Sequence, residues 1–370
     1  MDNVKCRIKD VSNYLESIAP LAYQESYDNA GLIVGDADTV VTGILLSLDC
    51  TEAIIDEAIS KNCNLVIAHH PIVFKGLKKL NGKNYVERTV IKAIKNDVAI
   101  YAIHTNLDNV LGGVNSMIAE KLNLQNVQIL VPKTGFLSKL VSFVPTDHTQ
   151  KVLDALYAVG VGQIGNYDHC SFSVNGKGTF RPNQKAVPFI GQSDVNETVN
   201  EDRIEVIFTS YLESKIILVL QQSHPYEEIA YYISNLNNMN QEVGSGAIGT
   251  LAEAVSSIDF LQILKQTFQL SVVKHTTILK DKIQKIAVCG GSGSFLLNDA
   301  IRAGADVFIT ADYKYHEFFD ADGHLLICDI GHYESEVCTK ELLLRILSDK
   351  FPIFAVLLAE TNTNPVFYFI

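Results

Sequence analysis

Side chains that could bind metal ions are concentrated in three short stretches of the sequence. Each stretch follows a run of aliphatic residues that predicts a short buried strand. In open α/β sheets, ligands bind beyond the carboxyl ends of the strands, so these positions favour a functional site. The stretches are "AHHP" with His69 and His70, "IHTNLDN" with His104 and Asp108, and "DIGHYESE" with His332 and Glu336.

The spacing of His332 and Glu336 would allow both side chains to bind the same metal ion. Gly331 breaks the preceding strand, and the residues that follow have helical periodicity. Residues at i and i+4 lie on one face of a helix, so both side chains can reach one metal ion. By itself, such a pair is also typical of an exposed helix face. Its position directly after a predicted strand favours a site.

The adjacent histidines raise a geometric problem. In an extended chain, His69 and His70 point to opposite sides, so they share one ion only if the backbone turns between them. Two ions about 3.5–4 Å apart remove the difficulty, because each histidine can bind a different ion. Asp108 or Glu336 would then bridge the pair. The alternative is two histidines satisfied by caps or by the core.

Other candidate sites are weaker. The stretch "VCGGSGSF", residues 288–295, is either an anion cradle that could contact a triphosphate or a tight packing turn, and it lacks the P-loop ending. His316 lies beyond another predicted strand, where pocket lining and structural packing are equally consistent with the pattern. No Gly-x-Ser-x-Gly nucleophile motif is present. The histidines without an identifiable partner are His148, His169, His224, His275 and His324.

Composition excludes several classes of protein. The chain of 370 residues has 42 acidic and 30 basic side chains, a net charge of −12. This balance, without a Lys/Arg block, disfavours nucleic-acid binding. The N-terminal stretch has no signal-peptide pattern, and no apolar run approaches the ~18 residues typical of a membrane span. These features predict a cytoplasmic protein.

The cysteines limit the chemistry of any metal site. There are seven, and no two have Cys-x-x-Cys spacing. This pattern excludes a zinc ribbon and argues against a disulfide framework. A metal site must then consist of histidines and carboxylates.

The alternation of patterns predicts three segments. Residues 1–133 and 244–370 alternate strand-like and helix-like runs, typical of α/β lobes with largely parallel sheets. The last of these runs, "IFAVLLAE", is expected to be a strand of the second lobe. Residues 134–243 differ and predict an inserted ferredoxin-like βαββαβ module. Within it, residues 191–203 are expected to form a solvated loop, and the stretch after His224 has a helical pattern.

Several motifs together resemble one family. Their order along nearly the whole chain is similar to that of the Nif3-like dinuclear-metal family, whose members are often labelled GTP cyclohydrolase I type 2 homologues. One departure is in "FITADYKYH": many relatives have Thr-Gly-Asp there, and this chain has Ala311 in the place of the glycine. The motifs are "YQESYDNAGLIVGD", "AHHPIVFKGLKKL", "AIHTNLDNVLGGVN", "VCGGSGSFLLNDAIRAGADVFITADYKYHEFFDA", "DIGHYESE" and "TNTNPVFYFI".

The resemblance implies a fold, an assembly and a set of ligands. It implies two α/β lobes with a dinuclear site between them, in a toroidal homohexamer whose sites face the interior. His104 would lie in the pocket near the metals. The middle segment looks like the insert of the longer bacterial members, and "HPYEEIAYYI" resembles a stretch of the CutA and P-II trimer-forming regulators. The implied metal ligands are His69, His70, Asp108, His332 and Glu336.

Two functions follow as hypotheses. The first is a metal-dependent hydrolase that acts on a nucleotide such as GTP, with His104 or His316 as the catalytic proton shuttle. The second is a non-catalytic metal-binding or regulatory assembly. For either function, histidine and carboxylate ligands suit two divalent ions per chain, with Zn or Fe favoured and Mn or Co also compatible.

Overall fold

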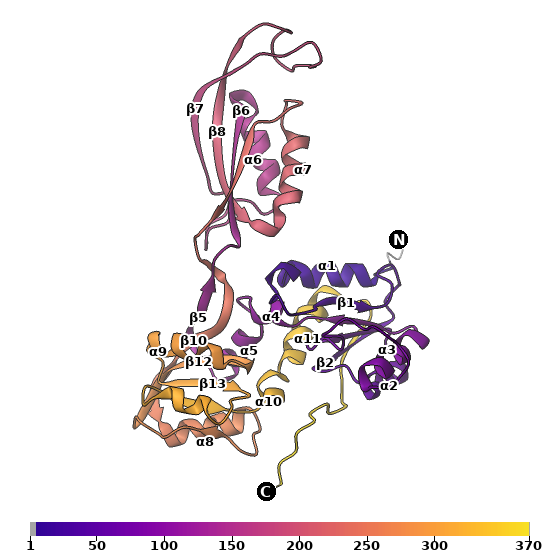
Figure 1. Cartoon of the computed structure of the whole chain (residues 1–370), viewed down its shortest axis with the longest axis vertical. Helices are drawn as coiled ribbons and strands as arrows, with labels where there is room; N and C mark the ends of the chain where they lie inside the picture. Colours follow the sequence, from indigo (N-terminus) through magenta and orange to yellow (C-terminus); the bar gives the residue numbers. More distant parts are fainter. Residues whose placement is uncertain (1–4, 370) are drawn as a thin grey trace. The chain divides into compact units, whose positions relative to one another are not determined.

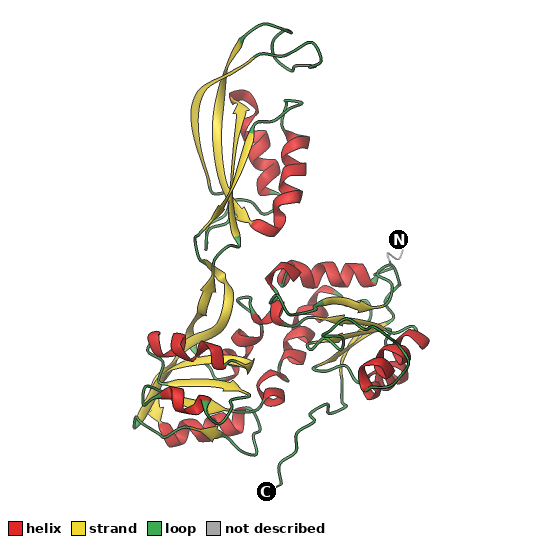
Figure 2. Ribbon diagram, in the orientation of Figure 1, coloured by secondary structure: helices red, strands yellow, loops and turns green. Residues whose placement is uncertain are grey.

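The chain has a mixed α/β fold with three sheets (Figures 1 and 2). The structure is a computed structural model and describes residues 5–369. These residues form two compact units. One unit combines the chain up to Val131 with the chain from Glu242 onward, and the second unit is Pro132–Gln241.

The first unit contains a five-stranded sheet. The strands β2, β3, β4 and β15 are parallel, and β1 is antiparallel to β4. Its core includes Leu45, Val66 and Ile100, which are fully buried. The strands, in sheet order, are β1 (Gly31–Val34), β4 (Ala99–Ala102), β3 (Leu65–Ala68), β2 (Gly43–Ser47) and β15 (Ala355–Leu358).

Two capped helices cover this sheet. The hydroxyl of Thr51 accepts a hydrogen bond from the Ile54 N–H and starts α2 (Glu52–Ser60). The amide oxygen of Asn84 caps α3 (Tyr85–Lys95) in the same way. Such caps satisfy backbone donors that the first helical turn leaves free. Apolar residues of both helices join the core of the first sheet.

A six-stranded sheet forms the other half of the first unit. The strands β12, β13 and β14 are parallel, while β10 and β11 pair with antiparallel neighbours. Phe308 and Ile327 are fully buried in its core. The strands, in sheet order, are β11 (Lys274–His275), β14 (Leu326–Asp329), β13 (Val307–Ala311), β12 (Lys282–Ser292), β10 (Asn240–Ser256) and β5 (Gln125–Lys133).

The last strand belongs to the first sheet, and the expectation that it lies in the second lobe is wrong. After α11 (Thr339–Lys350), the chain returns and β15 pairs with β2, Val356 opposite Ile44. The apolar run of β15 specifies a strand but not its neighbour. That choice depends on the open edge beside β2, which only the tertiary structure provides.

The second unit has a four-stranded antiparallel sheet in the order β7, β8, β6, β9. Two helices pack on one of its faces around Leu140, Ile204 and Leu220. The elements, in chain order, are β6 (Leu137–Pro145), α6 (Thr149–Tyr157), β7 (Ser171–Phe180), β8 (Glu197–Thr209), α7 (Glu213–Ser223) and β9 (Tyr231–Leu236).

Two local expectations for this unit are wrong. Most of the polar stretch expected as a loop is strand, because β8 begins at Glu197 and pairs with β7 from there to Val206. The stretch after His224 that has a helical pattern forms β9 instead. In both cases strand pairing in the sheet overrides the local preference of the sequence.

The helices of the chain are short. The longest helix in the described part of the chain, α11, has 12 residues. Within residues 5–369, none of the helices has the length and apolar character that crossing a bilayer requires.

Strand register aligns the ends of the strands that precede the candidate ligands. Ser47, Ala68 and Ala102 are aligned across β2, β3 and β4. In the second sheet, Thr310 of β13 is aligned with Asp329 of β14. The carboxyl ends of these parallel strands therefore present rows of side chains at the edge of each sheet. Two residues beyond the first row come Asp49, His70 and His104.

We expect residues 135–238 to be removable without unfolding the rest of the chain. The core of the second unit contains residues of that unit alone, and β5 and β10, which enter and leave it, are hydrogen-bonded neighbours that a short turn can join. Circular dichroism and thermal melting of the shortened chain should show a cooperative transition. Residues 132–241 expressed alone are the matched control and should fold too. Loss of cooperative melting in the shortened chain would contradict the expectation.

Candidate metal centre

The three histidine-containing stretches converge at the carboxyl ends of parallel strands. His69 and His70 follow β3, Asp108 ends the short helix α4 (Thr105–Asp108) after β4, and α10 (His332–Glu336) follows β14. Their ligand atoms form three groups within which all atoms lie within 4.8 Å of one another. Each group could hold a metal ion. The groups are His69, His70 and His104; His70, His332 and Glu336; and His69, Asp108 and Glu336.

All four histidines of the cluster are oriented in the same way. In each ring Nδ1 donates a hydrogen bond to an oxygen, and Nε2 is left for the cluster. Metal-binding histidines in proteins typically have this arrangement, which fixes the tautomer and the ring orientation. The acceptors are Ile103 O for His69 at 2.8 Å, Asp49 Oδ1 for His70 at 2.7 Å, Asp28 Oδ1 for His104 at 2.8 Å and Asp312 Oδ2 for His332 at 2.7 Å.

Glu336 is the carboxylate that the cluster shares. Its Oε2 lies 2.9 Å from Nε2 of His70 and 3.0 Å from Nε2 of His332. Its Oε1 faces Nε2 of His69 at 3.9 Å. The two oxygens therefore face different histidines, as a bridging carboxylate does in a two-metal site.

Two buried atoms of the cluster have no partner. Nε2 of His69 and Oδ1 of Asp108 lie 3.6 Å apart, and neither makes a hydrogen bond within residues 5–369. Buried polar atoms without partners are rare and costly. A cation between these atoms would satisfy both, so the residues present fit a metal ion.

Proximity shifts the pKa values of the cluster in opposite directions. Burial alone would lower the pKa of His70, but its hydrogen bonds to Asp49 and Glu336 raise it to about 9. For His332, burial is likewise outweighed by Asp312 and Glu336, and its pKa rises to about 11. Burial and the neighbouring Glu336 raise the pKa of Asp108 well above its ordinary value. The negative charges of the carboxylates in this site must therefore be balanced by positive charges, either on the histidines or on bound cations.

The glycine-rich stretch packs against the centre. The Gly290 N–H donates to Asn115 Oδ1 and the Gly291 N–H donates to Ser335 Oγ, at 2.9 and 3.0 Å. Gly291 has φ +59°, and a Cβ there would lie 2.4 Å from Oε1 of Glu336. These contacts favour the packing interpretation of this stretch over an anion cradle, because both N–H groups are already bonded.

Sequence reasoning missed the residues that hold the histidines. Asp49 and Asp312 follow β2 and β13, so the same strand-end argument could have found them. Asp28 had no comparable signal, because it lies in a loop remote in sequence from His104. Its carboxylate accepts hydrogen bonds from the His104 ring and from the backbone and hydroxyl of Thr105.

The two histidines predicted as proton shuttles lie in different surroundings. His104 belongs to the cluster, with its ring centroid 5.2 Å from that of His69 and 5.4 Å from that of His70. His316 is exposed, and its ring contacts in the described part of the chain are to Tyr315 and Phe319. The structure therefore brings His104, but not His316, into the cluster.

The sequence of the chain is similar to those of known proteins. The profile of the family described as Duf34/NIF3 (NGG1p interacting factor 3) matches residues 6–365. The chain belongs to the DUF34/NIF3 family. Two relatives named GTP cyclohydrolase 1 type 2 homolog are 39% identical (Halalkalibacterium halodurans) and 36% identical (Bacillus subtilis). In each case the match covers 96% of this chain and 97% of the relative.

Solved structures of NIF3-related proteins have a similar fold. A Bacillus cereus protein related to NIF3 aligns with a TM-score of 0.86 at 36% identity, over 98% of this chain and 99% of its own. The Staphylococcus aureus protein SA1388 aligns with a TM-score of 0.79 at 32% identity over the whole of both chains. The mixed α/β architecture is thus the one found in NIF3 proteins.

We expect Gly291→Ala to reduce metal binding at the candidate centre of this NIF3 protein. The added Cβ collides with Oε1 of Glu336, whereas in Gly304→Ala, at φ +71°, a Cβ meets nothing within 4 Å. Both variants strain the backbone, and only the first displaces the shared carboxylate. Elemental analysis after gel filtration should show metal loss in Gly291→Ala alone. Equal metal content in the two variants would contradict this role of Gly291.

We expect Asp28→Asn to reduce stability in a pH-dependent way. Burial alone would raise the pKa of Asp28, but hydrogen bonds from His104, Thr105 and Asn29 lower it to about 2. A carboxyl group whose pKa is lowered by folding stabilises the protein above its ordinary pKa and loses that effect as the pH falls.

Urea unfolding should therefore show a loss of about 1–2 kcal/mol in Asp28→Asn between pH 5 and 7. The difference from wild type should shrink between about pH 4 and 2. Asp97→Asn, at an exposed loop position, is the control and should match wild type. A difference that does not change with pH would contradict the proposed origin of the effect.

Proposed function

We propose that this NIF3 protein is a metal-dependent hydrolase with a dinuclear centre. The observation that carries the proposal is the convergence of the Nε2 atoms of three histidines, His69, His70 and His332, on the buried carboxylate of Glu336. Within residues 5–369, Nε2 of His69 and Oδ1 of Asp108 are buried there without a hydrogen bond. Ionised buried groups in this arrangement are stable only when their charges are balanced. The proposed ligands are His69, His70, Asp108, His332 and Glu336.

The distribution of atoms supports two ions per chain. His70 and His332 face Oε2 of Glu336, while His69 faces Oε1 and lies beside Asp108. One ion would bind in each half of this arrangement, with Glu336 between them. Imidazole and carboxylate donors suit Zn²⁺, Fe²⁺, Mn²⁺ or Co²⁺, of which we favour zinc or iron. Cys289 lies near the site, but burial raises the pKa of its thiol, which keeps it neutral.

His104 is the residue that we propose to move a proton. Its Nδ1–H is held by the carboxylate of Asp28, so its Nε2 is the basic atom of the ring. That atom lies within reach of the cluster, where a general base has to be. When bound, divalent cations supply Lewis acidity and promote ionisation of water.

We propose a nucleotide such as GTP as the substrate. The support comes from the names of the relatives, which describe GTP cyclohydrolase 1 type 2 homologues. A name of this kind is an analogy, so the substrate class needs a direct test. Gly290 and Gly291 are not the proposed phosphate contacts, since their N–H groups bond to Asn115 and Ser335.

A regulatory assembly is the second candidate function. It is favoured by the second unit, which has its own core and the strand order β7, β8, β6, β9. We propose that this unit is a ferredoxin-like module of the CutA and P-II kind. In this alternative the chains form a toroidal hexamer, and the metal centre has a structural role.

We expect Glu336→Gln to lose metal and His104→Ala to keep it. The amide removes the negative charge that two cations would share, whereas His104 supports the site from outside the proposed ligand set. Loss of such a supporting residue typically costs 10–100-fold in affinity or activity. Metal content per chain and hydrolysis of GTP are the two measurements, made beside wild type.

The control is Glu334→Gln, the same substitution on the same helix. Glu334 bonds to Asn364 and is not one of the clustered residues, so this variant should keep both ions. In a hydrolase, His104→Ala would lose turnover, by about 10–100-fold or more, with metals in place. In a regulatory protein, no variant would alter turnover, because wild type has none. Metal loss in His104→Ala with retention in Glu336→Gln would refute the ligand assignment.

A further inference from the structure

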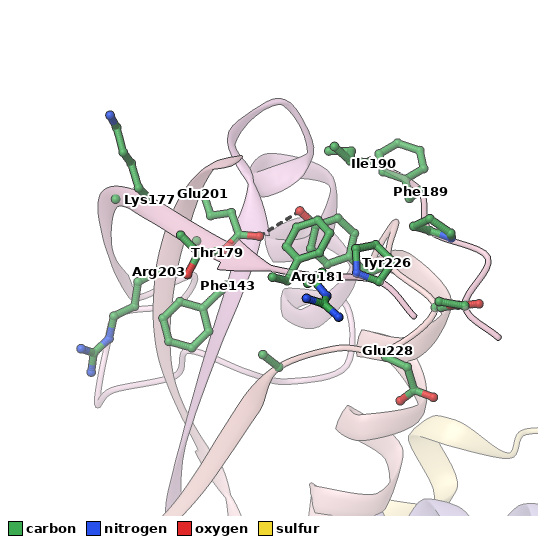
Figure 3. Close-up of a pocket in the computed structure, with 18 of the residues that line it drawn as sticks. Phe143, Lys177, Thr179, Arg181, Phe189, Ile190, Glu201, Arg203, Tyr226 and Glu228 are labelled. Atoms are coloured by element: carbon green, nitrogen blue, oxygen red, sulfur yellow. Dashed lines mark hydrogen bonds between the residues drawn. The ribbon is translucent and has the colours of Figure 1, made fainter. Parts of the chain in front are cut away.

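The second unit contains a large cavity that the metal centre does not involve. Its volume is about 640 Å³, within the range of small-molecule sites. Val144 and Ile204 point toward α6 and α7, so their strand neighbours Phe143 and Arg203 point to the opposite face of the sheet. The cavity lies on this opposite face. It is bordered by residues of 180–190 and of 226–230, which follow α7 (Figure 3).

A buried carboxylate lines the cavity. Glu201 of β8 is 8% exposed, and its Oε1 accepts a hydrogen bond from the hydroxyl of Tyr226 at 2.9 Å. No hydrogen bond from residues 5–369 reaches its Oε2. Gly178 makes room for this oxygen, since a Cβ there would lie 1.9 Å from it. The cavity therefore presents a fixed acceptor to a ligand that can donate.

Aromatic rings form much of the wall around this acceptor. Tyr226 has ring contacts with Phe180 at 5.9 Å and with Phe189 at 6.4 Å between centroids. Phe143 lines the cavity from β6. The loop that contains Phe189 is joined to the segment after α7, because the Val187 N–H donates to Oε1 of Glu227 at 2.8 Å. Walls of this kind suit a flat, largely apolar ligand.

A cation without a close partner completes the site. In Figure 3 the guanidinium of Arg181 points into the cavity, whereas Lys177 and Arg203 point outward. The carboxylate paired with Arg181 is that of Asp194, 3.9 Å away, beyond hydrogen-bond distance. An anionic group on a ligand would give Arg181 the bidentate partner that a guanidinium prefers.

We propose that this cavity binds a small aromatic anion that also carries an amino or hydroxyl group. The ring packs against Tyr226 and its aromatic neighbours, the donor meets Oε2 of Glu201, and the anionic group meets Arg181. A purely apolar occupant would cover Oε2 of the buried Glu201 without giving it a hydrogen-bond donor. Arg181, whose side chain is 60% exposed, lies where it can meet the anionic group from the solvent side. A metal ion does not fit, because the clusters of ligand atoms found in residues 5–369 do not include the cavity. The proposal is independent of the metal centre and its chemistry.

The test uses two fluorescent probes that differ only in the donor. 6-Amino-2-naphthoate has the ring, the anion and the amine, and 2-naphthoate lacks the amine. The chain contains no tryptophan, so fluorescence in the naphthalene range belongs to the probe. Titration of the full-length protein should show binding of the amino probe, with 2-naphthoate about tenfold weaker, because a hydrogen bond to a charged acceptor is lost.

Two variants and a control assign the effect to residues. Glu201→Gln keeps the shape of the side chain and should erase the preference for the amino probe. Arg181→Gln should weaken both probes by a similar factor. Glu213→Gln, on α7 outside the cavity, should bind as wild type does, and thermal melting should show all three variants folded.

Three results would overturn the proposal. These are no binding of either naphthoate, equal binding of both, or binding that survives Glu201→Gln and Arg181→Gln unchanged. A folding defect in Glu201→Gln leaves the comparison of probes on wild type and the Arg181→Gln arm to decide the matter.

Discussion

The carboxylate of Glu336 lies between histidines that belong to the two sheets of the first unit. Glu336 is 3% exposed, and burying an anion is costly unless cationic or hydrogen-bonding groups surround it. His332 lies on the same helix as Glu336, His70 follows the end of β3, and the rings of both reach Oε2 of Glu336. The two sheets must therefore meet closely enough for this oxygen to be shared. Gly291 allows that approach, because any side chain there would collide with Oε1.

The C-terminal stretch contributes to the same arrangement. The hydroxyl of Thr363 donates to Oδ2 of Asp49 at 2.6 Å, and Oδ1 of Asp49 accepts from His70. Asn364 donates to Glu334 on α10. These bonds depend on β15, which brings the end of the chain back to β2. The tail thus orients a histidine of the cluster although it supplies none of the clustered atoms.

The two units use different physical chemistry. In the candidate metal centre, histidines and carboxylates converge, and opposite charges determine the geometry. In the second unit, aromatic rings line a cavity that also holds the carboxylate of Glu201, bonded through one oxygen to Tyr226, and the guanidinium of Arg181, 3.9 Å from Asp194. The first arrangement suits inorganic cations, and the second suits a small organic anion. One chain therefore combines two chemically distinct environments, each built on its own hydrophobic core.

Much of this could be predicted from the sequence because strand ends are local features. Apolar runs followed by His69 and His70, by His104, and by His332 identified the residues that cluster, since parallel strands present their carboxyl ends at one edge. The spacing of His332 and Glu336 is also a local feature, because residues at i and i+4 lie on one face of a helix. Composition likewise pointed to histidine and carboxylate donors, because thiols at isolated positions are more often buried hydrophobes.

Only the tertiary structure decided how distant segments pair. Asp28 lies 76 residues from His104, and no periodicity connects them, so their hydrogen bond could not be deduced. The membership of β15 in the first sheet depends on an open edge beside β2, and strand patterns do not specify neighbours. The cavity of the second unit arises where a loop closes over a sheet face. A sequence determines which faces are apolar, but the contacts that enclose a volume exist only once the chain has folded.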